Sequence, residues 1–221
     1  LLTAQDMTIS AGHDLSLRGG TVASAGRDTT LIAGNNIGLS AVADTTRSRS
    51  SSWGVTLSVQ KDGWSVGADA SRSAADATLF SNAQVTAGRN ATFVAGQDIS
   101  FIGANVSGKN IALAAGRDLN LISQQNVSTS NAWSFNVAVT FNGATPTGGT
   151  LGGSFSNGSR RYTDTPTTII ADEVLNAYAG RNTMLAGAGM WSKTGKLKLD
   201  TNDLVFDNYK DKDTYVALSG S

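Results

Sequence analysis

A short motif, in which glycine is followed by any residue and then by Asp or Asn, recurs along this chain at regular intervals. Gly88 and Gly108 are 20 residues apart, as are Gly96 and Gly116, and Gly88 precedes Gly96 by eight residues. Short segments of alternating apolar residues follow the motifs, which is the pattern of a strand with one side chain inward and the next outward. A period of about 20 residues is typical of a solenoid, whose successive coils stack on one another.

We interpret each copy of the motif as a sharp corner between two strands. Glycine would supply a positive φ angle at the corner, and the Asp or Asn side chain would hydrogen-bond locally to the turning backbone. The predicted corner residues are Gly12, Asp14, Gly26, Asp28, Gly34, Asn36, Gly88, Asn90, Gly96, Asp98, Gly108, Asn110, Gly116, Asp118, Gly180 and Asn182.

Three short strands fit each period. Two follow motifs that lie eight residues apart, and a third fits the longer gap, as at residues 21–23 and 105–107. The sequence therefore predicts an all-β fold, a parallel β-helix with three strands per coil and about six coils over residues 1–221. A helical repeat would need apolar spacings of three and four, an antiparallel sandwich would not give this fixed period, and the core pattern of leucine-rich repeats is missing.

The motif stops twice, and each gap holds a Ser-rich stretch followed by two alternating segments. We predict a β-hairpin excursion from the β-helix in each gap, over residues 44–83 and 128–168. The block of two coils and one hairpin occurs twice, 82 residues apart. Because an exposed solenoid end leaves strand edges unpaired, we expect the coils to stack continuously across each excursion, with Leu31 beside Phe93.

The composition excludes several classes of function. The chain has 17 basic and 17 acidic residues, so no net charge favours binding to nucleic acid. It has no cysteine, which excludes disulfides and thiolate metal sites. No apolar run reaches the roughly 18 to 20 residues that span a bilayer, and the first residues are not a signal peptide. We therefore expect a single β-helix segment of a larger protein.

The segment from Ala95 to Leu121, followed by a Ser/Thr-rich break and a hairpin that begins near Trp133, resembles a known repeat. It is similar to the hemagglutinin repeats of filamentous hemagglutinin and of the CdiA exoproteins of contact-dependent growth inhibition. The resemblance covers nearly the whole chain. It implies a right-handed β-helix, export through an outer-membrane transporter of the two-partner-secretion type, and a place on the Gram-negative cell surface or in the medium.

The resemblance also implies a function. In the growth-inhibition proteins, similar repeats form an extended stalk or a region implicated in moving a toxin across the target cell's outer membrane. We expect a non-catalytic, rod-like segment of an adhesin or of a growth-inhibition effector, which extends or delivers a distal functional domain. Besides the transporter, a target-cell outer membrane, a receptor or a glycan is a candidate partner.

The alternative is a β-helix protein that binds or cleaves polysaccharide. Such an enzyme would gather several acids and a base in one groove. In this chain most acids of the repeats lie at the predicted corners, and His13 is the only histidine. The sequence therefore predicts no catalytic, cofactor-binding or metal-binding residues.

Two groups of side chains are candidates for contact with a partner. Basic residues occupy equivalent corners of consecutive coils, where they would form a glycan-binding strip or simply lie in solvent beside acids: Arg27, Arg89 and Lys109. Three tryptophans lie on the predicted hairpins: Trp53, Trp64 and Trp133. These rings would anchor a partner or lipid, or each would pack its own hairpin against the flank of the β-helix.

Overall fold

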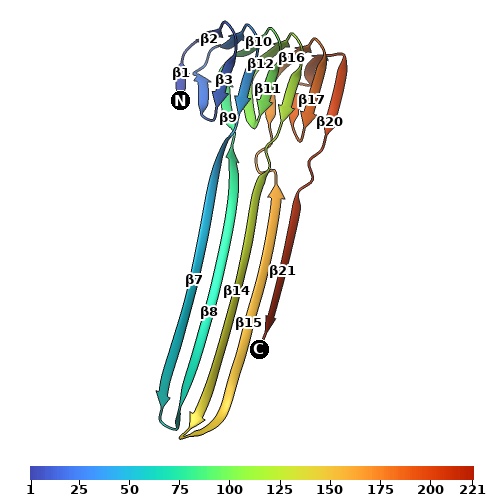
Figure 1. Ribbon diagram of the computed structural model, residues 1–221. Coiled ribbons are helices and arrows are strands. Elements are labelled where there is room, and N and C mark those ends of the chain that lie inside the picture. Colours follow the sequence, from blue (N-terminus) through green and yellow to red (C-terminus); the bar gives the residue numbers. More distant parts are fainter. The chain divides into compact units, whose positions relative to one another are not determined.

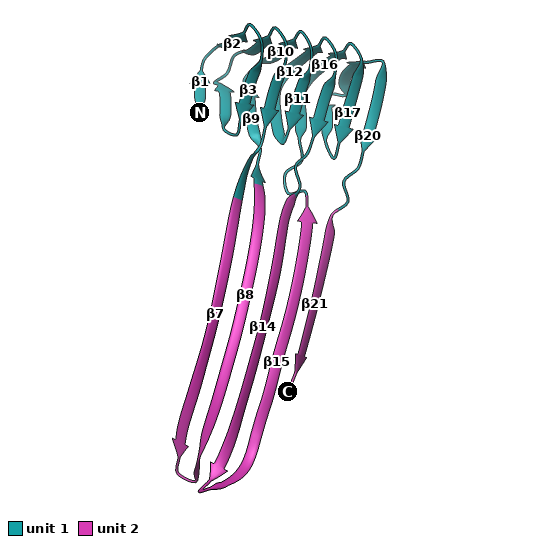
Figure 2. Ribbon diagram, viewed as in Figure 1, with its two compact units in different colours: residues 1–44, 80–125, 163–210 teal, residues 45–79, 126–162, 211–221 magenta.

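The computed structural model describes residues 1–221, and all of its regular structure is β-strand. The chain forms two compact units, each assembled from separate stretches of sequence (Figure 2). Unit 1 contains residues 1–44, 80–125 and 163–210. Unit 2 contains residues 45–79, 126–162 and 211–221.

Unit 1 is a parallel β-helix whose strands form three stacks (Figure 1). The first stack contains β2 (Met7–Ala11), β5 (Thr29–Ala33), β10 (Asn90–Ala95), the second halves of β12 (Ala104–Ala115) and β16 (Thr168–Ala179), and β19 (Lys196–Asp200). The second contains β3 (Leu15–Arg18), β6 (Ile37–Ser40), β11 (Ile99–Ile102), β13 (Leu119–Ile122), β17 (Asn182–Ala186) and β20 (Asp203–Asp207). The third contains β1 (Leu2–Ala4), β4 (Thr21–Ser24), β9 (Ala83–Ala87), the first halves of β12 and β16, and β18 (Gly189–Ser192). Each coil thus contributes one strand to each stack, and the predicted three-strand coils are confirmed.

The coil stack continues across the first excursion, as predicted. β5 pairs directly with β10, so that Leu31 lies opposite Phe93 in register. At the corner before these strands, the Arg89 N–H donates to the Arg27 carbonyl at 2.9 Å. β5 and β10 are therefore neighbours in space, although 62 residues separate the paired positions in sequence. Continuous pairing leaves only the two ends of the β-helix with free strand edges.

The interior of unit 1 consists of inward side chains that stack in rows from coil to coil. Fully buried rows run through β6, β11 and β13: Ile37, Ile99 and Leu119 in one, and Leu39, Phe101 and Leu121 in the next. Phe93 meets Phe101 edge to face inside the triangle, with ring centroids 5.4 Å apart. Period-two alternation in the sequence produces these rows, because every second side chain of each strand points into the core.

Unit 2 is a five-stranded antiparallel sheet built from the two excursions and the last strand. Its strands, in spatial order, are β21 (Lys212–Gly220), β15 (Thr145–Tyr162), β14 (Asn126–Asn142), β8 (Gly63–Ser81) and β7 (Val42–Gln60). The two predicted hairpins are present as β7–β8 and β14–β15. They are not separate, however, because β8 pairs with β14 from Trp64–Phe141 to Thr78–Val127. Pairing between hairpins hydrogen-bonds edges that would otherwise stay open.

Both excursions leave the β-helix at the same corner, between the second and third stacks. The chain leaves after β6 and after β13, and it returns at β9 and β16. The coils without an excursion close at this corner through glycines with positive φ: Gly19 and Gly20 at 60° and 82°, Gly103 at 68° and Gly187 at 57°. Coils that close at this corner therefore alternate with coils that open into a hairpin.

Candidate functional site

The corner between the first and second stacks carries a ladder of Asp and Asn side chains. Asp14 Oδ1 accepts from the Asn36 backbone N–H at 3.1 Å, and Asn36 Oδ1 accepts from the Asp98 N–H at 3.2 Å. Asp98 Oδ1 accepts from the Asp118 N–H at 3.2 Å, and Asp118 Oδ1 accepts from the Asn182 N–H at 3.1 Å. Each side chain therefore satisfies the backbone of the next coil, whereas the sequence interpretation had it bonding to its own turn.

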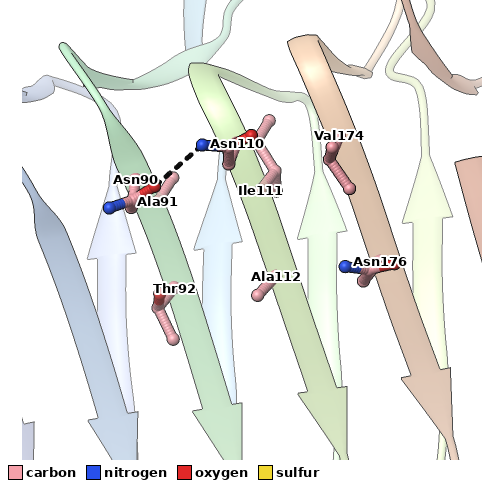
Figure 3. A pocket seen from close by; sticks show the side chains of 8 residues that line it. All are labelled: Asn90, Ala91, Thr92, Asn110, Ile111, Ala112, Val174 and Asn176. Atoms are coloured by element: carbon pink, nitrogen blue, oxygen red, sulfur yellow. Dashed lines mark hydrogen bonds between the residues drawn. The ribbon is translucent and has the colours of Figure 1, made fainter. Parts of the chain in front are cut away.

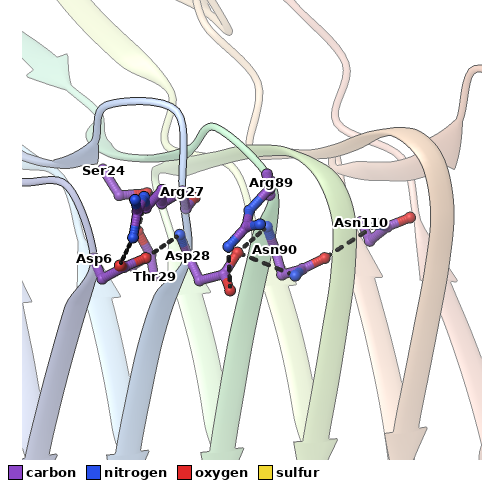
Figure 4. Close-up of polar contacts among 8 residues, drawn as sticks. All are labelled: Asp6, Ser24, Arg27, Asp28, Thr29, Arg89, Asn90 and Asn110. Carbon is purple, nitrogen blue, oxygen red and sulfur yellow. Dashed lines mark hydrogen bonds and ion pairs between the residues drawn. The ribbon is translucent and has the colours of Figure 1, made fainter.

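The corner between the third and first stacks carries a second ladder (Figure 4). Asp6 Oδ1 accepts from the Asp28 N–H at 3.3 Å, and Asp28 Oδ1 accepts from the Asn90 N–H at 3.2 Å. Asn90 Oδ1 in turn accepts from the Asn110 side-chain amide at 3.1 Å. The two ladders together contain every Asp and Asn singled out as a corner residue, and they join consecutive coils at two of the three edges.

Most of the corner glycines are needed for space and not for a positive φ. Among the eight predicted corner glycines, only Gly26 has a positive φ, 86°. A Cβ atom at four others would lie only 2.0 to 2.3 Å from the carbonyl oxygen of the equivalent glycine one coil earlier: Gly34, Gly96, Gly116 and Gly180. A Cβ at Gly88 would lie 2.1 Å from the Gly26 Cα, whereas Gly12 and Gly108 have room for one. The expectation of positive φ is therefore wrong for all but Gly26, and close coil spacing explains most of the rest.

The basic corner residues are ion-paired. Each contacts a carboxylate of a neighbouring coil: Arg27 with Asp6 at 2.9 Å, Arg89 with Asp28 at 3.3 Å, and Lys109 with Glu173 at 3.3 Å. A strip of unpaired cations, which a polyanionic glycan would require, is not formed at this corner.

A shallow trough crosses the outer face of the first stack over β10, β12, β16 and β19, and Figure 3 shows one part of it. Its floor is low because Ala112 and Ala114 point outward between longer side chains, and its two adjoining parts measure about 320 and 510 Å³. Lys198 and Asp200 are the charged residues that line it. The cluster of several acids and a base that a polysaccharide-cleaving site needs is not brought together in this trough. No group of three His, Asp or Glu side chains that could hold a metal ion is found in the chain.

The sheet of unit 2 has one apolar and one polar face. Along β7, Trp53, Val55 and Leu57 alternate with Gly54 and Thr56. The strand registers place the following side chains on the same side, here called the apolar face: Trp53, Val55, Leu57, Val59, Trp64, Val66, Trp133, Phe135, Val137, Val139, Phe141, Leu151, Phe155, Val216 and Leu218.

The apolar face is largely uncovered. Trp53 is 82% exposed, and Leu57 and Leu218 are each 67% exposed. The apolar side chains span seven residues on β7 and nine on β14 but only five on β15 and three on β21, which gives an apolar area on the order of 400 Å². Contiguous apolar surface of this size commonly marks a site of interaction with a protein or a membrane. No helix of the chain is long and apolar enough to cross a membrane.

The three hairpin tryptophans all lie on the apolar face. The Trp64 ring stacks on Phe141 with centroids 4.2 Å apart, and its Nε1 donates to the Gly143 carbonyl at 2.9 Å. Trp64 therefore packs against the other hairpin, instead of packing its own hairpin against the flank of the β-helix, which was one of the two alternatives that the sequence left open. Trp53 is the most exposed of the three, and Trp133 is 41% exposed.

Basic side chains border the apolar face on the same side of the sheet. This basic border consists of Arg47, Arg49, Arg72, Arg161 and Lys212. The one acid among them is Asp76, which pairs with Arg47 at 3.0 Å and with Arg49 at 2.7 Å. The sheet thus combines exposed apolar side chains with an excess of positive charge on one face.

Comparison with known proteins fits this repeated architecture. A family model described as the hemagglutinin repeat matches residues 2–137 and 130–219. The chain belongs to the hemagglutinin repeat family. No curated protein and no solved structure matches it. Hemagglutinin repeats are structural repeats of secreted or cell-surface exoproteins, including exoproteins of two-partner secretion.

In this hemagglutinin repeat segment, two polar residues that the sequence analysis missed fix the return from the second excursion. Thr167 Oγ1 accepts from the Gly103 N–H at 3.0 Å and donates to the Ile122 carbonyl at 2.8 Å. Ser123 Oγ accepts from the Thr167 N–H at 2.7 Å and donates to the Gly187 carbonyl at 2.6 Å. Both residues are buried. Their only sequence signal is their position, one just before and one just after the stretch that departs from the repeat.

Stability of the hemagglutinin repeat should depend on pH through Asp98. Hydrogen bonds from Arg117 are the main cause that lowers the pKa of the Asp98 carboxyl below its ordinary value. Because the folded pKa lies below the unfolded one, the ionised carboxylate stabilises the fold fully above about pH 4, and this stabilisation is lost as pH falls through the folded pKa.

We expect Asp98→Asn to be about 1 kcal/mol less stable than wild type at pH 7, the upper range for a partly exposed pair. The difference should shrink towards pH 3, because wild type then loses the same interaction. Urea unfolding at pH 7 and at pH 3 measures the difference in the free energy of unfolding. The control introduces Arg117→Gln into wild type and into the Asp98→Asn variant. A difference that is unchanged by pH, or that persists without Arg117, would contradict this assignment.

Proposed function

We propose that this chain is a non-catalytic, rod-like segment of a secreted Gram-negative surface exoprotein, which extends or delivers a distal functional domain. Family membership supports the secreted, adhesin-like repeat, and it supports a two-partner-secretion transporter as the export partner. The observation that carries the proposal is the pairing of β5 with β10 across an excursion. Because coils contact only their neighbours, each added block lengthens the rod without changing the coils already present.

Removal of one block should therefore shorten the rod and leave it folded. Deleting residues 34–115 joins Ala33 to Gly116 and so restores the Ala-Gly step found at both ends of the deleted block. Thr8 and Lys198 lie in one outward row with five strand spacings between them. Since the chain has no cysteine, spin labels on cysteines at these two positions report the distance by electron paramagnetic resonance.

The distance between the labels should fall by about 10 Å, two strand spacings, from roughly 24 Å. The matched control replaces residues 46–79 by a short Gly/Ser linker, which removes a hairpin and no coil. The control should leave the distance unchanged, because loop-closure cost depends only weakly on length. The additive rod is refuted if the variant that lacks residues 34–115 does not fold. It is also refuted if the distance between the labels changes in the hairpin control but not in the block deletion.

We infer a second role for unit 2, an active segment that engages a target-cell membrane. An adhesin and a growth-inhibition effector both need a rod, and delivery across a membrane would in addition use a large apolar surface on the hairpins. The exposed apolar face favours this role, since a sheet normally buries such a face against a second layer. Binding to lipid vesicles is the expected property.

A further inference from the structure

The apolar face and the basic border meet at one row of the sheet. Arg72 on β8 lies directly opposite Trp133 on β14, with Phe155 opposite Trp133 on β15. From this row the apolar side chains continue towards the β7–β8 turn, while the arginines continue in the other direction. A molecule that covers the row would therefore contact apolar surface on one side and positive charge on the other.

A small depression lies at this row. It measures about 230 Å³ and is lined by Arg49, Ser50, Ser51 and Arg72. Arg49 Nη2 donates to both carboxylate oxygens of Asp76 at 3.0 and 2.7 Å, and Arg49 Nη1 donates to the Ser48 carbonyl at 2.8 Å and to the Ala75 carbonyl at 3.2 Å. These four bonds leave only the Arg49 Nε–H without a partner, so Arg49 contributes mainly positive charge to the depression. The neighbouring Arg72 guanidinium can offer its planar set of donors to phosphate oxygens.

Arg72 has no carboxylate partner, whereas Arg47 and Arg49 share the single carboxylate of Asp76. Further along the basic border, Arg161 and Lys212 lie directly opposite each other on β15 and β21. Like charges in opposed positions destabilise a sheet. The face therefore carries a positive charge that a bound anion would neutralise.

We propose that Arg72, beside the positive charge of Arg49, binds the phosphate of an anionic phospholipid whose acyl chains lie against the apolar face. The proposal rests on the membrane role inferred for unit 2 and adds its lipid class and its binding residues. A second copy of the same face would bring the two basic borders together or set one against apolar surface, so a lipid with an anionic headgroup fits better. Nucleic acid would leave the exposed Trp53 and Leu57 without a partner.

The two faces and the edge strands of the sheet determine its orientation at the membrane. The polar face consists mainly of glycines and of Ser, Thr and Asn side chains, including Gly54, Thr56, Ser134 and Asn136. β7 and β21 are edge strands with unpaired backbone groups, which are costly in hydrocarbon. The sheet therefore lies flat in the interface, with the apolar face in one leaflet and the arginines at the headgroups.

Vesicle co-sedimentation of the whole chain tests the proposal. The two vesicle types are phosphatidylcholine alone and an equal mixture of phosphatidylcholine and phosphatidylglycerol. Wild type should bind the mixture much more tightly. Arg72→Gln should lower affinity for the mixture about fivefold, the effect of one basic residue near an anionic surface, and Arg72→Lys should retain most of it. Arg160→Gln, a basic residue on the polar face, is the matched control and should have little effect.

A second pair of variants tests the apolar contact. Leu57→Asn should weaken binding to both vesicle types about tenfold, whereas Thr56→Asn on the polar face should not. Circular dichroism confirms the fold of each variant, and analytical ultracentrifugation reports self-association.

The outcomes separate the two proposals. Equal affinity for both vesicle types, or equal loss with Arg72→Gln and Arg160→Gln, would overturn the phosphate site and leave the membrane role intact. Failure to bind either vesicle, or a dimer that Leu57→Asn dissociates, would overturn both.

Discussion

The chain with alanine in place of Gly116 should unfold roughly 5 to 10 °C below wild type, with a loss of about 2 to 3 kcal/mol in the free energy of unfolding. The added Cβ would lie 2.1 Å from the Gly96 carbonyl oxygen. The coils cannot simply move apart, because the Gly116 N–H donates to the Ala95 carbonyl at 3.0 Å and the Arg117 N–H donates to the Gln97 carbonyl at 2.8 Å. The clash must therefore be relieved by shifting backbone in two coils.

Gly108→Ala is the matched control, because Gly108 occupies the same motif at the other corner. Its nearest neighbours to a new Cβ are 3.5 Å away, and its φ is not positive. Alanine there should be neutral or stabilise by about 0.5 kcal/mol through the lower entropy of the unfolded chain. Thermal unfolding followed by circular dichroism measures both. Equal effects of the two substitutions would show that general glycine flexibility, and not coil spacing, determines the stability of the corners.

The β-helix could be predicted from the sequence because its determinants repeat. Leu31 and Phe93 occupy the same place relative to a Gly-x-Asp/Asn motif, so a correct period assigns them to adjacent strands even across an excursion. The same reasoning located the third strand at residues 21–23, which the structure extends to Thr21–Ser24. The repeat period identifies which residues are equivalent in successive coils. Because the coils stack, equivalent residues then lie next to each other.

The structural role of each corner residue could not be predicted from the sequence in the same way. A glycine is compatible both with a positive φ and with close approach of another backbone, and only the neighbouring coil distinguishes the two. For Gly116 that neighbour is Gly96, 20 residues earlier. Likewise Asp98 bonds to Asp118 of the next coil, a partner that no local turn rule specifies.

The pairing between the two hairpins could not be predicted from the sequence either. Alternation along β8 and β14 predicts a strand in each case, but it does not name the partner on the outer side of each hairpin. The structure pairs Ala68 with Val137, which joins the two hairpins into one sheet. The apolar face exists as a surface only after that pairing, which is why the tryptophans alone did not reveal it.

Replacing Phe93 by alanine should be the most damaging single change in the core, with a loss of about 3 to 5 kcal/mol. Phe93 is fully buried and contacts Phe101 edge to face across the interior. Its neighbours in the row are Leu31 and Leu113, one coil on either side. Because both are held by continuous strand pairing, they cannot move in to fill the space, and the cavity should stay open.

Two controls separate the cavity from the loss of an aromatic ring. Phe93→Leu matches the leucines on both sides and should cost no more than about 1.5 kcal/mol. Phe206→Ala removes an aromatic ring that is 67% exposed in β20 and should change stability by less than about 0.5 kcal/mol. Urea unfolding gives all three free energies. If Phe93→Ala cost no more than Phe93→Leu, the coils would have to collapse around the missing ring, and the rigid stacking on which the rod depends would be refuted.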